Sequence, residues 1–161
     1  FAGLITRNAA IMEYLDGLLN VEEFVRALIR RGAGPDVIKA CLAALADAVN
    51  GLNAAGAYHA DLSGKNIFTG DGRAFYFIDL DAVELGGTYT DERRMTNLVQ
   101  LYDSFCDELN DMFLAPFLMR MLPTGYDPRV WLPRVRAGQR RRRARLARRR
   151  EKQGRGKNLL P

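Results

Sequence analysis

Oxygen-bearing side chains gather in one stretch near the middle of the chain. Asp61 and Asn66 stand five residues apart in a polar segment, and Asp79 follows an apolar run. Two carboxylates and an amide oxygen form a hard ligand set that suits Mg²⁺, which takes its remaining ligands from phosphate and water. The residue types therefore predict a magnesium site, provided that the intervening chain folds back on itself.

The segment between Asn66 and Asp79 predicts that fold-back. Residues 67–69 and 74–79 are typical of strands, and the Gly-Asp-Gly-Arg sequence at 70–73 tolerates the positive φ of a tight hairpin turn. In a hairpin, the end of the second strand lies beside the start of the first. We therefore expect Asp79 to lie beside Asn66.

Apolar residues at helical spacing predict the scaffold around this hairpin. One helix is expected to begin at Asn20 and to end at Gly32, and a second to begin at Pro35 and to end near Gly56. The fold class predicted from these patterns is α+β, mainly α. The other expected elements are helices over 91–108, over 109–122 and from about 127, short strands over 4–6 and 10–15, and a loop over 82–90.

Charge divides the chain into two parts. Of the 24 Lys and Arg residues, 13 lie within 134–157 beside one acidic residue, while the rest of the chain is acidic by seven charges. We predict a domain over 1–133 and a basic helical extension over 134–161, disordered from 153. The run Arg140–Arg150 fits a solvated helix end, a site for anionic lipid head groups, or a site for nucleic acid. No aromatic residue interleaves the run, which disfavours nucleic acid.

Composition narrows the class of protein. A chain of 161 residues allows one domain with a sizeable core, and no unbroken apolar run reaches the ~18 residues of a membrane-spanning helix. Cys41 and Cys106 lie in apolar patterns and are expected to be buried free thiols, and a single histidine excludes a His-rich metal site. We expect a cytoplasmic protein without a secretory signal. Because the chain begins with Phe1, it is expected to be a segment of a longer protein.

Taken together, the motifs resemble the carboxyl-terminal lobe of protein-kinase-like enzymes. Residues 59–66, His-Ala-Asp-Leu-Ser-Gly-Lys-Asn, have the spacing of the catalytic loop, and Asp79-Leu80-Asp81 resembles the metal-binding motif. Residues 11–17 resemble the hinge between the two kinase lobes, so the resemblance covers about residues 4–120. With Asn97-Leu98 after an Arg-rich helix start, the chain is most similar to the lipopolysaccharide core kinases, which phosphorylate Kdo or heptose sugars at the cytoplasmic membrane face. Aminoglycoside and choline kinases are the nearby alternative.

The resemblance implies ATP and Mg²⁺ as cofactors and suggests a role for each polar residue. Asp61 would orient or deprotonate the acceptor hydroxyl, and Lys65 would approach the transferred phosphoryl group. Asn66 and Asp79 would hold Mg²⁺ on the nucleotide phosphates. His59 is expected to brace the loop rather than to act as an acid or base.

The sequence departs from the protein-kinase pattern in ways that concern the acceptor. Ala60 replaces the usual arginine, and only about a dozen residues separate Asp79 from the helix near residue 91, without an A-P-E motif. A peptide substrate needs a longer segment there, so the expected acceptor is a small molecule or a glycolipid. Asp81 replaces the glycine of D-F-G and is expected to serve as a second metal ligand or to cap the loop.

The nucleotide-binding half is incomplete in this sequence. The backbone at Glu13 and Leu15 would contact adenine, but no Gly-rich phosphate loop precedes the hinge. Two functions stay open. One is an ATP-dependent phosphotransferase acting on a sugar hydroxyl of lipopolysaccharide inner core, peripheral on the inner membrane through Arg140–Arg150. The other is a non-catalytic kinase-like module held to an anionic membrane or to nucleic acid by its basic extension.

Overall fold

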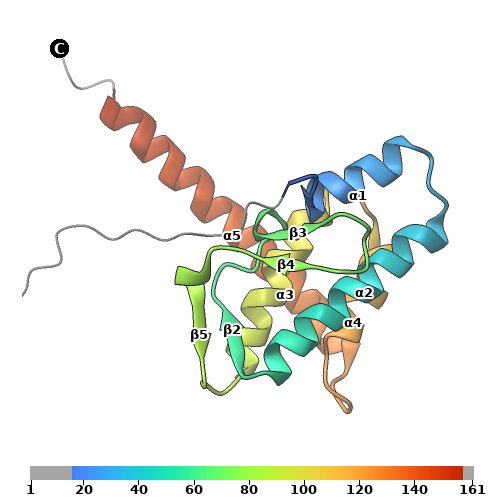
Figure 1. Cartoon of the computed structure of the whole chain (residues 1–161). Coiled ribbons are helices and arrows are strands. Elements are labelled where there is room, and N and C mark those ends of the chain that lie inside the picture. Colours follow the sequence, from blue (N-terminus) through green and yellow to red (C-terminus); the bar gives the residue numbers. More distant parts are fainter. Residues whose placement is uncertain (1–15, 158–161) are drawn as a thin grey trace, which may run out of the picture.

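The computed structural model describes the backbone of residues 16–157 and the side chains of residues 16–151 (Figure 1). This part of the chain is mainly helical with two small sheets, as the sequence predicts. The strands expected over 4–6 and 10–15 lie outside it, as do Glu13, Leu15 and most of the predicted hinge. The elements are β1 (Leu19–Asn20), α1 (Val21–Arg30), α2 (Pro35–Ala54), β2 (Ala57–His59), the 3-10 helix η1 (Gly64–Asn66), β3 (Ile67–Thr69), β4 (Tyr76–Phe77), the 3-10 helix η2 (Leu80–Ala82), β5 (Val83–Leu85), α3 (Asp91–Phe105), α4 (Asp111–Arg120) and α5 (Pro128–Lys157).

The first two helices begin and end as the sequence predicts. The side chain of Asn20 accepts a hydrogen bond of 3.0 Å from the backbone N–H of Glu23, which satisfies a free donor at the start of α1. Gly32 follows that helix with φ +70°, a conformation in which a side chain would be strained. Pro35 occupies the first turn of α2, where its missing N–H costs nothing.

Helix α2 forms the centre of the core. Its buried face, with Leu42, Leu45 and Val49, packs against α4, which contributes Leu114 and Phe117. Among the described helices, α2 alone is long and apolar enough to cross a membrane by length and composition, although the sequence shows no unbroken apolar run of that length. The central helix of a globular core has the same properties.

The two cysteines are free thiols, as expected, but their surroundings differ. Cys41 on α2 is buried, and burial raises the pKa of its thiol to about 11, so the thiol stays protonated at neutral pH. Cys106 after α3 is only partly buried, which corrects the expectation that both are buried.

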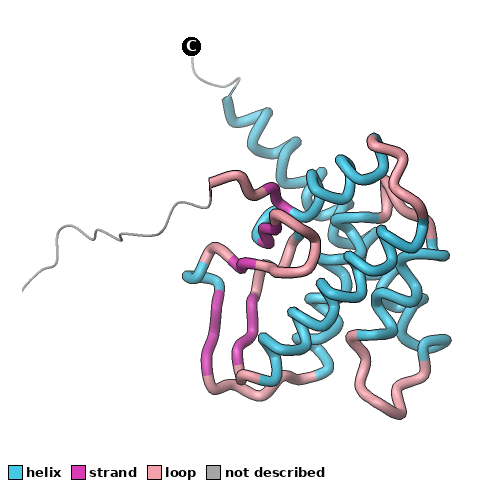
Figure 2. Tube along the Cα trace, turned by 45° about the vertical axis from the view of Figure 1, so that its right-hand side comes forward, coloured by secondary structure: helices cyan, strands magenta, loops and turns pink. Residues whose placement is uncertain are grey.

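The predicted hairpin is present. Strands β3 and β4 pair antiparallel, with Ile67 opposite Phe77 and Phe68 opposite Tyr76, and β1 pairs with the other edge of β3. A second pair was not expected: β5 forms in the segment predicted to be a loop and pairs antiparallel with β2, so that His59 stands opposite Val83. Figure 2 shows this pair at one edge of the helical body. The chain after the hairpin therefore returns directly along β2.

Helix α5 is continuous from Pro128 to Lys157, so the predicted boundary at residue 134 falls inside it, and the helix continues past residue 153. Its first half is part of the core, where Trp131 and Val135 are buried. The approach to α3 is close: a Cβ at Gly138 would lie 2.6 Å from Cγ2 of Val99. The second half projects beyond the body (Figure 1).

Candidate active site

The loop after β2 brings Asp61 and Asn66 together. The side-chain nitrogen of Asn66 donates hydrogen bonds to the backbone oxygen of Asp61 at 2.9 Å and to its carboxylate at 3.2 Å. Both acceptors are oxygens, which fixes the orientation of the amide. The amide oxygen of Asn66 therefore faces away from Asp61, free to approach a cation.

Asp79 lies beside this pair because of the hairpin. The N–H of Ile78 donates to the backbone oxygen of Asn66 at 3.0 Å, so Asp79 is the next residue along the chain from that contact. Asp79 has φ 64° and ψ 56°, a left-handed conformation that no other non-glycine residue among those described adopts. Such a backbone is costly for a residue with a side chain, and it ends the strand direction at Asp79, whose side chain is exposed where η2 begins.

His59 joins the two loops. Its side chain is fully buried; Nδ1 accepts a hydrogen bond from the N–H of Asp61 at 3.2 Å, and Nε2 lies 2.8 Å from the backbone oxygen of Ile78. These partners require the Nε2–H tautomer, in which Nε2 donates and Nδ1 accepts. One imidazole thus fixes the backbone of Asp61 and the backbone of Ile78, the residue directly before Asp79. This arrangement matches the bracing position expected from the sequence.

Helix α3 supports the loop from below with three polar side chains. Asn97 donates to the backbone oxygen of His59 at 2.8 Å, and Gln100 donates to the backbone oxygen of Ala60 at 2.7 Å and accepts from the N–H of Leu62 at 3.0 Å. The hydroxyl of Ser104 accepts from the N–H of Gly64 at 2.8 Å.

The supporting roles of Gln100 and Ser104 were missed from the sequence. The available signal was their spacing: positions 97, 100 and 104 recur at helical intervals, beside an apolar face that should be buried. Gln100 and Asn97 are themselves buried. Buried polar side chains need partners, and here the partners are the backbone groups of the loop.

Gly64 lets the loop approach its support closely. A Cβ at this position would lie 2.7 Å from Cγ of Glu22 on α1 and 3.2 Å from Cβ of Ser104. Steric crowding therefore explains the glycine at position 64, since any side chain would push the loop away from α1 and α3.

The Arg-rich start of α3 braces the second strand pair. The guanidinium of Arg93 stacks over the ring of Tyr58 at 4.4 Å and pairs with the carboxylate of Glu84, so it connects β2 with β5. Arg94 stacks over Tyr89 at 4.6 Å and donates to the backbone oxygen of Met121 at 3.0 Å. These two arginines hold the backbone around the site rather than face it.

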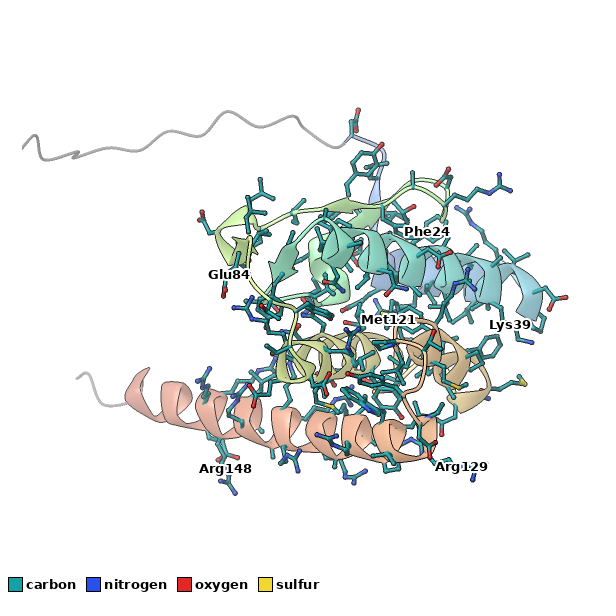
Figure 3. All side chains as sticks on the ribbon, turned by 90° about the horizontal axis from the view of Figure 1, so that it is seen from below. Phe24, Lys39, Glu84, Met121, Arg129 and Arg148 are labelled. Atoms are coloured by element: carbon teal, nitrogen blue, oxygen red, sulfur yellow. The ribbon has the colours of Figure 1, made fainter. Side chains whose placement is uncertain are left out.

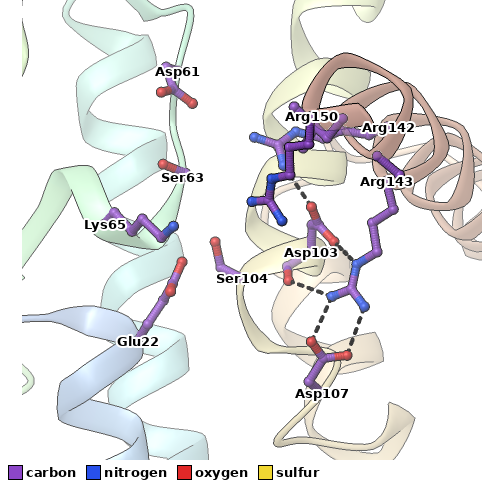
Figure 4. Close-up of a pocket in the computed structure, with 12 residues that line it drawn as sticks. Glu22, Asp61, Ser63, Lys65, Asp103, Ser104, Asp107, Arg142, Arg143 and Arg150 are labelled. Atoms are coloured by element: carbon purple, nitrogen blue, oxygen red, sulfur yellow. Dashed lines mark hydrogen bonds and ion pairs between the residues drawn. The ribbon is translucent and has the colours of Figure 1, made fainter. Parts of the chain in front are cut away.

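A cleft of about 650 Å³ opens beside the loop (Figure 4). Asp61, Ser63 and Lys65 line one side of it together with Glu22. The opposite side comes from α3, the turn after it and α5, which contribute two acidic and three basic residues. That second lining is Asp103, Ser104, Asp107, Arg142, Arg143 and Arg150, with Leu146 and Ala147. Asn66 and Asp79 do not line the cleft, so Asp61 stands between the cleft and the proposed metal ligands.

Ion pairs hold α5 against α3 at this cleft. Arg142 donates to the carboxylate of Asp103 at 2.6 Å, and Arg143 binds both oxygens of Asp107 at 2.9 Å while also donating to Asp103. Burial by itself raises the pKa of Asp103, but hydrogen bonds from Arg143, Gln139 and Arg142 outweigh it, and the net shift lowers this pKa below its usual value. Asp103 is therefore ionised throughout the neutral range.

The lowered pKa of Asp103 predicts how stability depends on pH. A carboxyl whose pKa is lower in the folded state stabilises the fold above its unfolded value of about 3.9, and that stabilisation disappears as the pH falls through the folded value. We expect Asp103→Asn to be less stable than the wild type by about 1–2 kcal/mol at pH 7. Urea unfolding at pH 7 and in steps down to pH 2 should show the difference shrinking only in the acidic steps. A constant difference would contradict this prediction.

The residues near the loop fit a magnesium ion that is shared with a phosphate. Within residues 16–157, no group of three or more His, Cys, Asp or Glu side chains is arranged to hold a metal by itself. Asn66 and Asp79 instead offer two neighbouring oxygen donors, both accessible to solvent. Mg²⁺ is commonly bound in this way, by one or two protein oxygens with the remaining positions filled by phosphate and water.

Comparisons with known proteins concern the fold and the family of the chain. Among solved structures, the fold is similar to that of "WaaP in complex with acyl carrier protein", with a TM-score of 0.63 and 22% sequence identity over 83% of this chain. The match covers 59% of that structure, so the chain spans less than two thirds of its length. No curated protein matches the chain. The model of the lipopolysaccharide kinase (Kdo/WaaP) family matches residues 2–116, which is more than two thirds of the sequence. The chain therefore belongs to the lipopolysaccharide kinase (Kdo/WaaP) family.

Proposed function

We propose that the chain is the carboxyl-terminal catalytic lobe of an ATP- and Mg²⁺-dependent kinase that phosphorylates a hydroxyl of Kdo or heptose in the lipopolysaccharide inner core. One observation carries the proposal: the Asn66 side chain binds Asp61, and the Asn66 backbone binds the residue before Asp79. Base and metal ligands thus share one rigid support. Family membership favours a lipopolysaccharide acceptor over an aminoglycoside or choline.

In this proposal Asp61 receives the proton of the acceptor hydroxyl. Its carboxylate lines the cleft, where a sugar can reach it, and the hydrogen bond from Asn66 holds one of its oxygens in place. A base held in this way contributes by orientation as well as by proton transfer. Lys65 lines the same cleft and is exposed. Its ammonium group can reach a phosphate that lies between Asp61 and the metal ligands.

Asn66 and Asp79 are the proposed metal ligands. When bound, Mg²⁺ neutralises and orients the nucleotide phosphates. The adenine is proposed to lie against the backbone at Glu13 and Leu15, outside the described residues. The interval of about a dozen residues between Asp79 and the start of α3 at Asp91 supports a small or glycolipid acceptor, because a peptide substrate needs a longer segment there.

We propose that the outward face of α5 attaches the protein to anionic lipid at the cytoplasmic side of the inner membrane. Arg148 points away from the body in Figure 3, whereas Arg142 and Arg143 are paired to α3. The stretch Arg140–Arg150 thus has two faces, and only the outward one is available to a membrane. Each exposed arginine near such a surface contributes about 1 kcal/mol. Nucleic acid is the less favoured partner.

The metal assignment predicts the effect of Asp79→Asn. Asparagine tolerates the left-handed backbone at this position, so the fold should be retained while one negative oxygen is lost. We expect the Mg²⁺ concentration for half-maximal phosphate transfer to lipopolysaccharide core to rise at least about ten-fold. Transfer of labelled phosphate across a Mg²⁺ titration measures this.

The matched control is Asp36→Asn, because Asp36 is exposed in the first turn of α2. It should leave the Mg²⁺ dependence unchanged. If Asp79→Asn and the wild type respond to Mg²⁺ alike, the metal assignment is wrong. If the wild type transfers no phosphate to the core sugars with its complete nucleotide site present, the proposed function is wrong.

A further inference from the structure

The cleft lies on the acceptor side of the proposed catalytic base. Asp61 lines it, but the proposed metal ligands Asn66 and Asp79 do not. A nucleotide held through those ligands would therefore leave the cleft open for the molecule that receives the phosphoryl group. The volume of about 650 Å³ falls within the range of sites that hold small ligands, about 300–1,000 Å³.

One face of α5 forms the far wall of this cleft. Residues 142, 143, 146, 147 and 150 line it, and these positions recur on one side of an α-helix. In Figure 4, Arg142, Arg143 and Arg150 extend from α5 toward the cleft, across from Asp61, Ser63 and Lys65. Position 148 falls on the opposite side of the helix, and Arg148 points outward in Figure 3.

The charges on this wall differ in whether they are neutralised. Arg142 pairs with Asp103, whose side chain is only 10% exposed, and Arg143 pairs with both Asp103 and Asp107. Arg150 lines the same cleft, and no carboxylate of the described residues lies within 4.0 Å of its guanidinium. Among the described residues, Arg150 is therefore the one cation of this wall that no carboxylate neutralises.

We infer that Arg150 binds an anionic group of the acceptor, a carboxylate or a phosphate on a sugar next to the one that is phosphorylated. This inference rests on the proposed function, since it takes the cleft beside Asp61 as the acceptor site. A guanidinium suits either anion because it can donate two parallel hydrogen bonds. The paired arginines hold the helix in place, so Arg150 reaches the cleft from a fixed support. Arg150 is thus a residue that determines acceptor specificity, not a member of the reacting group.

Equilibrium binding tests this directly. Isothermal titration of the whole chain with a soluble, deacylated inner-core oligosaccharide measures affinity without a membrane. We expect Arg150→Ala to raise the Kd for the oligosaccharide about ten-fold. Arg148→Ala should leave this Kd unchanged, because Arg148 lies on the side of α5 opposite the cleft. The difference should shrink in about 1 M NaCl, where charges more than about 3 Å apart are screened. Affinity for Mg²⁺-ATP should be the same in both variants.

Two modified oligosaccharides identify the anion. If the carboxylate of Kdo is the partner, reducing it to an alcohol abolishes the difference between the variants, and removing the phosphates does not. The reverse result identifies a phosphate. Equal binding of the acceptor by Arg150→Ala and Arg148→Ala would overturn the inference, as would a loss confined to ATP.

Failure of this inference and failure of the proposed function are distinguishable. Phosphate transfer by the wild type with equal binding by the two variants would reject the role of Arg150 and keep the kinase. Weakened binding in Arg150→Ala without any transfer by the wild type would keep the anion site and reject the kinase.

Discussion

Replacing Asp61 with asparagine is expected to slow phosphate transfer by about 10²–10⁴-fold. The new side chain has nearly the same shape, and its amide oxygen can still accept the hydrogen bond from Asn66. The fold should therefore persist while the group that takes the proton is lost. Steady-state kinetics with lipopolysaccharide core as the acceptor measures the effect, and we expect it in kcat with little change in the KM for ATP.

Asp36→Asn again serves as the control for Asp61, because it removes one exposed negative charge far along the chain from the loop. Its rate should equal that of the wild type. If Asp61→Asn retains more than about a tenth of the wild-type rate, Asp61 is not the base. The assignment of the cleft beside it as the acceptor site then loses its support.

Replacing His59 with alanine is expected to lower the free energy of unfolding by about 2–4 kcal/mol and kcat by at least about ten-fold. The stability is lost because the change leaves a cavity and removes the buried partner of both the Asp61 N–H and the Ile78 oxygen. The rate falls because His59 positions Asp61 and Asp79 relative to each other without touching the substrate. Urea unfolding and kinetics well below the melting temperature measure the two effects.

Val49→Ala separates positioning from general destabilisation. Val49 is buried on α2, away from the loop, so its truncation also leaves a cavity. We expect it to destabilise the protein while kcat and the Mg²⁺ dependence stay as in the wild type. If His59→Ala loses stability alone, as Val49→Ala should, the histidine is a structural residue with no influence on the site.

Local signals in the sequence predicted most of the scaffold correctly. The capping residue Asn20, the C-terminal Gly32 and Pro35 each act through neighbours within four residues, so their effects can be predicted without the tertiary fold. The hairpin was also predictable, because its turn residues and strand pattern are contiguous. Its consequence, Asp79 next to Asn66, followed from geometry alone.

Features that depend on distant parts of the chain were not predictable in the same way. Strand β5 pairs with β2, which is more than twenty residues earlier in the chain, whereas the local sequence of β5 predicts a loop. Gln100 and Ser104 bind the loop across some forty residues, and their spacing indicates a shared helix face but not which distant groups they bind. Arg142 and Arg150 could not be distinguished from the sequence, because the division of the basic run into two faces depends on how α5 packs against α3.

Because α5 is one continuous helix, the angular position of each residue around its axis determines which side chains face the cleft. One rigid rod runs from Val135 in the core to Arg150 at the cleft, a span of about 22 Å at 1.5 Å per residue. Deleting one residue between them, such as Arg140, would rotate everything beyond it by about 100°. The positions now held by Arg142, Arg143 and Arg150 would then be held by Arg143, Ala144 and Glu151, so an acidic side chain would replace Arg150 at the cleft. Composition and net charge would barely change. Ligand binding at the cleft therefore depends on the register of α5 and not on its number of arginines.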